Sequence, residues 1–125
     1  MEKQDKYIQF GSTEYKALNV NSIDDLKPGM LVYSTNKAYA YEVSIYLLKE
    51  CLELAGPKTR KYKTEMYSYD NSRARVYQHK NFEVHFSVSD FKSGRYLFDQ
   101  EIASKITDCF DKPIVIIQMQ INAVR

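Results

Sequence analysis

The chain contains no tryptophan, and only two cysteines, three prolines and four glycines among its 125 residues. Two cysteines cannot form a disulfide framework, and no cysteine pair has the spacing of a zinc site. The sequence also lacks an apolar run of the roughly 20 residues that a membrane helix needs. Its first residues, MEKQDK, do not open a signal peptide. We therefore expect a cytoplasmic protein without a membrane partner.

Tyrosine, in contrast, is abundant, with eleven residues, and lysine, isoleucine and asparagine are also plentiful. AT-rich codons favour these four amino acids, which agrees with a virus or a mobile element as the source. The length predicts one domain over residues 1–125, in which residues 1–20 form either an arm or an edge strand. A hydrophobic content of 44% and a charged content of 27% are ordinary for a globular protein.

Two helices are expected. Residues 37–55 place apolar side chains at a spacing of three to four, and Gly56-Pro57 supplies a stop. Asp99 can cap a second helix of about three turns, whose apolar stripe includes Ile102 and Ile106. Each cysteine lies on the apolar side of one of these helices. We therefore expect Cys51 and Cys109 to be buried, free thiols. A shorter helical turn with a capping box is expected at Ser22–Asp25.

Strands are expected at residues 7–10 and 30–34, and in three runs between residues 60 and 88. In residues 82–88 apolar and polar side chains alternate, which predicts a core face formed by Phe82, Val84, Phe86 and Val88. A loop at 79–81 would join this strand to residues 73–78 as a hairpin. A turn at residues 71–72 would pair Tyr67 with Val76 and Tyr69 with Ala74.

The run at 114–117 is apolar on both faces and predicts a central strand. The resulting order of elements predicts an α+β fold, a mainly antiparallel sheet with two helices packed on one face. An elaborated ferredoxin-like (split βαβ) arrangement is the preferred form, and an irregular α+β fold is the alternative. In either form we expect one buried cluster that contains Val84, Phe86, Ile106 and Ile116.

Residues 58–80 carry seven positive and two negative side chains, a local charge of +5 in a chain whose net charge is +2. Four tyrosines are interleaved with these cations. This combination is typical of surfaces that neutralise phosphates and stack bases, and also of hot spots at protein interfaces. A purely structural role is a further alternative, because lysine and arginine at a sheet edge prevent edge-to-edge association.

The sequence contains no glycine-rich phosphate loop and no nucleophile elbow. His79 falls in a predicted loop, and only Glu83 and His85 share a strand face, so these three residues do not form a metal-ligand set. We therefore expect no enzyme activity, no catalytic residue, no metal site and no cofactor.

The function expected from these observations is that of a small non-enzymatic binding module. It would use the basic, tyrosine-rich hairpin at 58–80 to bind nucleic acid, with arginines on phosphates and tyrosines on bases. The alternative is a protein-binding inhibitor or adaptor that docks on a protein partner such as a nucleic-acid-processing enzyme. For either partner the expected contact residues are Arg60, Tyr62, Lys63, Arg73, Arg75, Tyr77 and His85.

Overall fold

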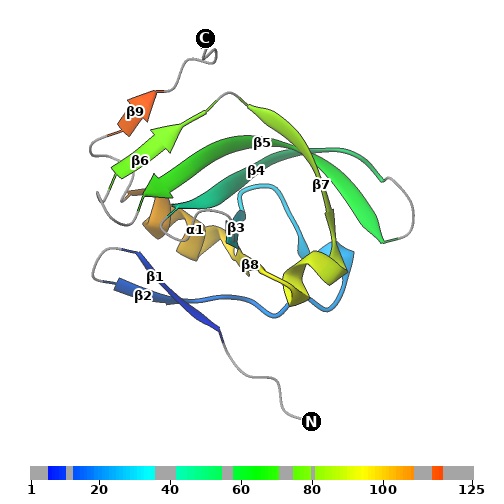
Figure 1. Ribbon diagram of the computed structural model, residues 1–125. Coiled ribbons are helices and arrows are strands. Elements are labelled where there is room, and N and C mark those ends of the chain that lie inside the picture. Colours follow the sequence, from blue (N-terminus) through cyan, green and yellow to red (C-terminus); the bar gives the residue numbers. More distant parts are fainter. Residues whose placement is uncertain are drawn as a thin grey trace.

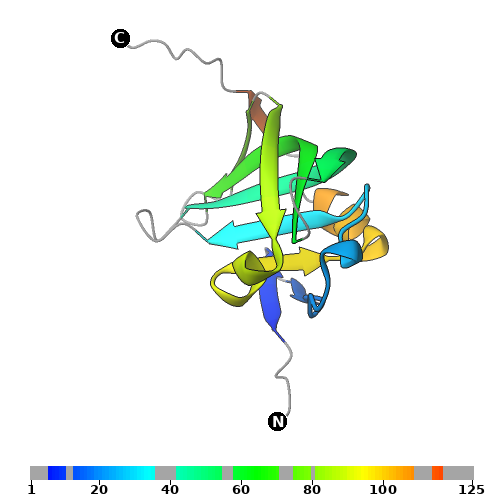
Figure 2. The ribbon, with the colours of Figure 1, turned by 90° about the vertical axis from the view of Figure 1, so that its right-hand side faces the viewer.

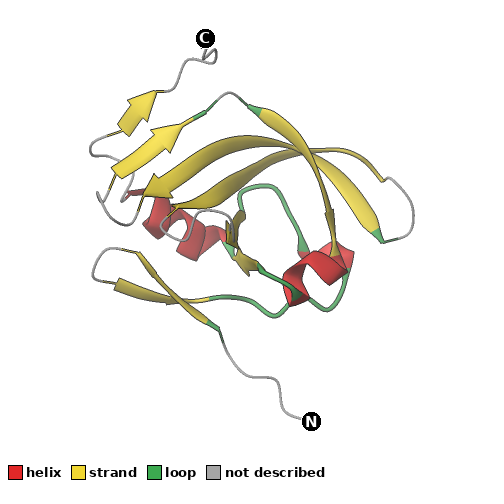
Figure 3. Cartoon of the chain, in the orientation of Figure 1, coloured by secondary structure: helices red, strands yellow, loops and turns green. Residues whose placement is uncertain are grey.

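The computed structural model describes residues 6–10, 13–35, 42–54, 58–70, 75–79, 81–108 and 114–116. Within these residues a large, mainly antiparallel sheet dominates (Figures 1 and 3). Its strands hydrogen-bond in the order β8-β3-β4-β5-β6-β9, and β7 also pairs with β5. The strands are β3 (Leu31–Thr35), β4 (Glu42–Leu54), β5 (Thr59–Asp70), β6 (Arg75–Gln78), β7 (Phe82–Ser87), β8 (Arg95–Phe98) and β9 (Ile114–Ile116).

Smaller elements surround this sheet. The strands β1 (Tyr7–Phe10) and β2 (Thr13–Lys16) form a separate two-stranded sheet. Two 3₁₀ turns, η1 (Ile23–Asp25) and η2 (Val88–Lys92), precede β3 and β8, and one α-helix, α1 (Gln100–Thr107), follows β8. None of the helices in these described ranges has the length and apolar character that crossing a membrane requires.

The large sheet is strongly curved. The strand β5 pairs with β7 over residues 59–64 and with β6 over residues 67–70, so its two halves have different neighbours. In β4 the register shifts between Leu48 and Glu50 and again between Cys51 and Glu53. Such irregularities bend a strand and increase its twist. The bend lets β7 cross the sheet and lead through η2 into β8 at the far end of the strand order (Figure 2).

The sheet buries side chains on both of its faces. Neighbouring residues in a strand point to opposite sides, so Leu31 and Val32 of β3 enter different cores. The first core joins the sheet to β1 and α1, and its buried members are Phe10, Ala17, Leu31, Val43, Ile45, Val76, Phe98, Ala103 and Ile106. The second core joins the opposite face to η1, and its buried members are Val20, Ile23, Leu26, Val32, Leu48, Tyr62, Phe86 and Leu97.

The helix predicted at 37–55 is wrong, because residues 42–54 form the strand β4. Val43 and Ile45 are buried in the first core, whereas Leu48 is buried in the second. Two buried faces in the first half of β4, followed by the exposed apolar side chains of Cys51 and Leu52, together give a helix-like spacing. Only α1 is an α-helix in the described ranges, so the two-helix, ferredoxin-like arrangement is not confirmed. The coarser expectation of α+β with a mainly antiparallel sheet agrees with the structure.

The capping residues predicted at the starts of helical segments are confirmed. Ser22 and Asp25 form a capping box around η1, and the backbone N–H of Ile102 donates to the Asp99 carboxylate at 2.8 Å. The strands expected near 7–10 and 30–34 are also present as β1 and β3. These predictions succeed because each depends on a few consecutive residues.

The predicted hairpin around residues 79–81 is wrong. The strands β6 and β7 both pair with β5 and not with each other. In the pairing of β5 with β6 the register differs by two residues from the expected one, since Tyr69 lies opposite Val76. A shift of two keeps every side chain on its face. Tyr67 and Tyr69 therefore pack against the first core, on the face that the expected pairing would also have given them.

The predicted single cluster is also wrong. Phe86 is fully buried in the second core, but Ile106 is buried in the first. Phe82, predicted to face a core, is 44% exposed. The strand β9 pairs with β6 in parallel at the end of the strand order, although residues 114–117 were expected at its centre. The side chain of Ile116 lies outside the described residues.

Cys51 is exposed, which contradicts its predicted burial, because it lies in a part of β4, residues 49–52, where every side chain is exposed. Cys109 lies outside the described residues. We expect a maleimide to label the native protein at Cys51 under conditions that leave the fold intact. Mass spectrometry of the wild-type chain beside Cys51→Ser checks this expectation. Labelling that occurs only after denaturation would contradict the position of Cys51 in β4.

Candidate functional site

The predicted contact residue Arg60 is part of the fold. Its guanidinium hydrogen-bonds the Asp24 carboxylate, and only 18% of its side chain is exposed. The contact ties η1 to β5. Arg60 therefore already has an anionic partner within the chain, and it is not a free cation for a phosphate.

Tyr62 was expected to point away from the core, and this expectation is wrong. Its side chain is 1% exposed and belongs to the second core, where its hydroxyl donates to the Leu26 carbonyl at 2.9 Å. Burial raises the pKa of this phenol. The prediction failed because it assumed a sheet with one buried face, whereas alternate residues of β5 from Arg60 to Thr64 face the second core.

Lys63 and His85 are exposed on the opposite face of the same strands. Lys63 of β5 lies between Glu50 of β4 and Glu83 of β7 in the strand register, and Lys61 Nζ lies 3.1 Å from a Glu83 oxygen. Opposite charges across neighbouring strands stabilise a sheet. The positive charge of this face is therefore compensated by carboxylates from β4 and β7.

Tyr77 is half-buried on β6, opposite Ser68, and belongs to neither core. His79 Nε2 lies 2.8 Å from the Ser68 hydroxyl. The backbone of Arg75 pairs with Asp70, but its side chain and the whole of Arg73 lie outside the described residues. Contact by Arg73, Arg75 and Tyr77 thus stays a prediction.

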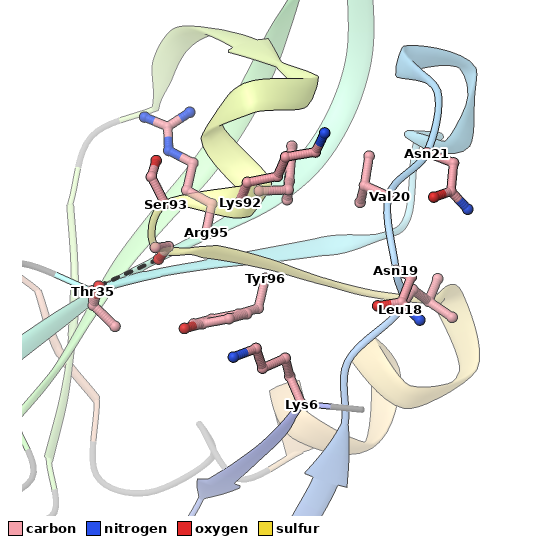
Figure 4. A pocket seen from close by; sticks show the side chains of 12 residues that line it. Lys6, Leu18, Asn19, Val20, Asn21, Thr35, Lys92, Ser93, Arg95 and Tyr96 are labelled. Carbon is pink, nitrogen blue, oxygen red and sulfur yellow. Dashed lines mark hydrogen bonds between the residues drawn. The ribbon is translucent and has the colours of Figure 1, made fainter. Parts of the chain in front are cut away.

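A different part of the structure is a second candidate site. A hollow of about 570 Å³ lies on the side of β8 that faces away from β3, between the end of η2 and the segment that joins β2 to η1 (Figure 4). Its walls carry the cations Lys6, Lys92 and Arg95 and the aromatic rings of Phe91 and Tyr96. None of the described residues that line it is acidic. The hollow therefore suits an anionic ligand.

Backbone hydrogen bonds hold the walls of the hollow together. The N–H of Leu18 donates to the Leu97 carbonyl at 2.6 Å, and the N–H of Ala17 donates to the Lys6 carbonyl at 2.8 Å. On the other side, Gly94 has a φ of +143°, a conformation that side-chain-bearing residues rarely adopt. The N–H of Thr35 donates to the Gly94 carbonyl at 3.1 Å. Segments far apart in the sequence are thereby fixed around one space.

Arg95 is a structural cation of this hollow. Its Nη1 lies 3.3 Å from an Asp90 oxygen and 3.4 Å from the His85 carbonyl oxygen, and its guanidinium lies 5.0 Å from the centre of the Phe86 ring. Lys6 and Lys92 differ from it. Both are exposed, and neither forms an ion pair with another residue that the structure describes. They are the cations available to a ligand.

Tyr96 provides an aromatic surface on the same side of β8 as Lys6 (Figure 4). In Figure 4 Lys6 and the Tyr96 ring lie on one side of the β8 ribbon and Lys92 lies on the other side. The Tyr96 ring packs against Tyr33 with 6.1 Å between ring centres, and its side chain is only partly buried. Burial, together with Tyr96 and Tyr69, raises the pKa of Tyr33.

Sequence reasoning missed this site because its two lysines are far apart in the sequence. Lys6 precedes β1 and Lys92 ends η2. They line one hollow only because residues 17 and 18 hydrogen-bond both toward β1 and toward β8. No local pattern around either lysine carries that information.

The geometry of the hollow is the main guide to function, because the comparisons found no relative whose function could serve as a guide. The chain matches no protein-family model, no curated protein and no solved structure in comparisons with known proteins.

Proposed function

We propose that the protein is a non-enzymatic binding module for single-stranded nucleic acid, and that the hollow beside β8 is its main contact. The observation that carries this proposal is the combination of two lysines, without an ion pair among the described residues, and a partly exposed tyrosine ring in one hollow. Lysines attract the phosphates of a strand, and an aromatic ring stacks an unpaired base. A base within a duplex is not free to reach such a ring.

The compensated charges on β5 favour the hollow over the 58–80 segment as the main contact. A phosphate placed on Lys63 would approach Glu50 and Glu83, which lie opposite it on both neighbouring strands. Like charges at short range disfavour such a contact. Arg75 and Tyr77 belong to β6, and together with Arg73, which precedes β6 in the sequence, they are proposed as a second contact for a longer strand.

The second candidate is a protein-binding inhibitor or adaptor. Phe82 supports it, because this large apolar side chain is 44% exposed. Aromatic residues are enriched at protein interfaces. In this alternative the partner is an enzyme that processes nucleic acid, and the protein itself does not bind the strand.

Fluorescence anisotropy with labelled single strands of about 15 nucleotides, a length close to one small binding site, tests the proposal. We expect DNA or RNA strands to bind, with an affinity that falls as salt rises from about 50 to 150 mM. The double variant Lys6→Ala with Lys92→Ala should reduce the slope of log K against log salt by about 1.4, since each phosphate contact contributes about 0.7. Tyr96→Leu should cost about 1–3 kcal/mol of binding free energy with little change in slope.

The matched control is Lys61→Ala with Lys63→Ala, which removes two lysines from the compensated face of β5. This variant should bind nearly as the wild type does, and circular dichroism should confirm that every variant is folded. If only Arg73→Ala with Arg75→Ala weakens binding, the strand is bound but the hollow is not the main contact. If no single or double strand binds at any salt concentration, the proposal is rejected in favour of the protein-binding candidate.

A further inference from the structure

The outer edge of β7, on the side away from β5, carries backbone groups that face away from the sheet. Among the residues that the structure describes, β7 pairs with β5 alone, in a regular register from Phe82 to Ser87 without a bulge. Figure 2 shows β7 in front of the other strands. The N–H of Ser87 donates to Asp90 Oδ2 at 2.9 Å, and the His85 carbonyl accepts from Arg95 Nη1 at 3.4 Å. Backbone groups of Ser87 and His85 therefore point away from β5.

Glu83 shares this outward direction. In an antiparallel ladder, alternate residues direct both of their backbone groups toward the same neighbour, so residues 83, 85 and 87 face the outer edge and residues 82, 84 and 86 face β5. The Ser87 N–H is already bound to Asp90. The His85 carbonyl has a second lone pair beside the one that Arg95 uses. The N–H and C=O groups of Glu83 and His85 are thus the part of the edge that a further strand can pair with.

We propose that β7 pairs antiparallel with β7 of a second copy of the chain, with Val84 at the two-fold axis. In this register Glu83 lies opposite His85 of the second copy, and each of the two equivalent pairs exchanges two backbone hydrogen bonds. The inference goes beyond nucleic-acid binding and does not depend on it. The chain forms a dimer through the edge of its sheet.

The side chains of the edge select this register. An axis through Glu83 would set two carboxylates directly opposite each other, and such like charges destabilise a sheet. With the axis at Val84, each carboxylate faces an imidazole, which can donate a hydrogen bond to it. Lys61 Nζ, 3.1 Å from a Glu83 oxygen, adds a cation to the same face. Charged side chains usually protect an edge from association, but these charges match in one antiparallel register.

The exposed ring of Phe82 also favours a second copy as the occupant of this edge. Phe82 is 44% exposed, although it lies on the same face of β7 as the fully buried Phe86. In the proposed register Phe82 lies opposite Phe86 of the second copy, and the two partly buried Val84 side chains meet at the axis. The dimer therefore covers apolar surface that a single chain leaves in solvent, and it joins the second cores of the two copies.

Sedimentation velocity of the full chain without nucleic acid, from low to high micromolar concentration, tests the pairing. We expect a dimer that dissociates in roughly the micromolar range, because an interface of one short strand is small. Glu83→Pro keeps the bonds to β5 but removes an outward N–H. It should weaken dimerisation by about tenfold or more, since two backbone hydrogen bonds per dimer are lost. The matched control Glu83→Gln keeps the N–H and should weaken it less.

His85→Glu is a second variant, at an exposed position where the fold should not depend on the side chain. It sets carboxylates opposite each other across the axis and should abolish the dimer at concentrations where the wild type is dimeric. Circular dichroism confirms that each variant is folded before its association is compared. This variant keeps the inference testable if Glu83→Pro fails to fold.

A cross-link tests the register. In a chain with Cys51→Ser and Cys109→Ser, Val84→Cys should form a disulfide between copies. Residues opposite each other in a non-hydrogen-bonded antiparallel pair have Cα atoms about 4.5 Å apart, which lies within the range of disulfides. Phe82→Cys in the same chain is the control. It should not cross-link, because position 86 and not position 82 of the second copy lies opposite it.

Two results would overturn the inference. One is a wild-type chain that stays monomeric at every concentration, which would leave the edge protected by its charges or open to a strand of another protein. The other is a dimer that neither Glu83→Pro nor His85→Glu weakens and that Val84→Cys does not cross-link, which would place the contact on a different surface. Nucleic-acid binding is measured separately, so either proposal can fail while the other stands.

Discussion

Replacing Phe86 with alanine is expected to lower the free energy of unfolding by about 3–5 kcal/mol, the range for a fully buried phenylalanine. Phe86 has no exposed surface. Its ring centre lies 6.0 Å from that of Tyr46, 6.3 Å from that of Tyr62 and 6.4 Å from that of Phe91. The truncated side chain would leave a cavity among these rings, and the sheet cannot close over it without bending.

Phe82→Ala is the matched control, because Phe82 has the same side chain and lies on the same strand. It is 44% exposed, so its truncation removes less buried surface and should cost about half as much. Urea unfolding at equal protein concentration measures both changes, provided that the slope of each transition stays the same. Equal losses for the two variants would contradict the assigned face of β7.

Phe86 also links the second core to the hollow. The guanidinium of Arg95 lies over its ring, and Arg95 begins β8 directly after the Gly94 turn. The same arginine contacts Asp90 in η2. Packing in the second core therefore helps to position the turn that forms one wall of the hollow.

Short-range features of the fold could be predicted from the sequence. The caps at Ser22 and Asp99 each need only a polar side chain placed before a helical turn. The inward position of Phe86 follows from the alternation of its strand. These signals are contained in a few neighbouring residues, so no knowledge of the rest of the chain is required.

Features that depend on distant pairing could not be predicted. The apolar spacing of residues 42–54 fits a helix and also fits a bulged strand whose first half is buried on both faces, and only the pairing with β3 and β5 decides between them. That error also placed Glu50 on a helix, away from Lys63. The excess of positive charge at 58–80 consequently looked uncompensated, and the hollow around Lys6 and Lys92 gave no signal at all.

Tyr62 gives the second large expected effect. Its variants decide whether Tyr62 is a core residue or a contact residue for the strand. Its side chain is 1% exposed, so Tyr62→Ala should lower the free energy of unfolding by about 3–5 kcal/mol. Tyr62→Phe keeps the ring but removes the hydroxyl that donates to the buried Leu26 carbonyl. A buried acceptor left without its donor costs about 1–3 kcal/mol.

Tyr77→Ala is the control for these variants, since Tyr77 is half-buried on β6 and lies outside both cores. Its truncation should destabilise the protein much less than Tyr62→Ala does. Thermal and urea unfolding measure stability, and strand-binding assays of the folded Tyr62→Phe variant measure function. A base stacked on Tyr62 would require an exposed ring. The opposite result, a Tyr62→Ala variant as stable as the wild type with weakened strand binding, would return Tyr62 to the binding surface and refute its place in the second core.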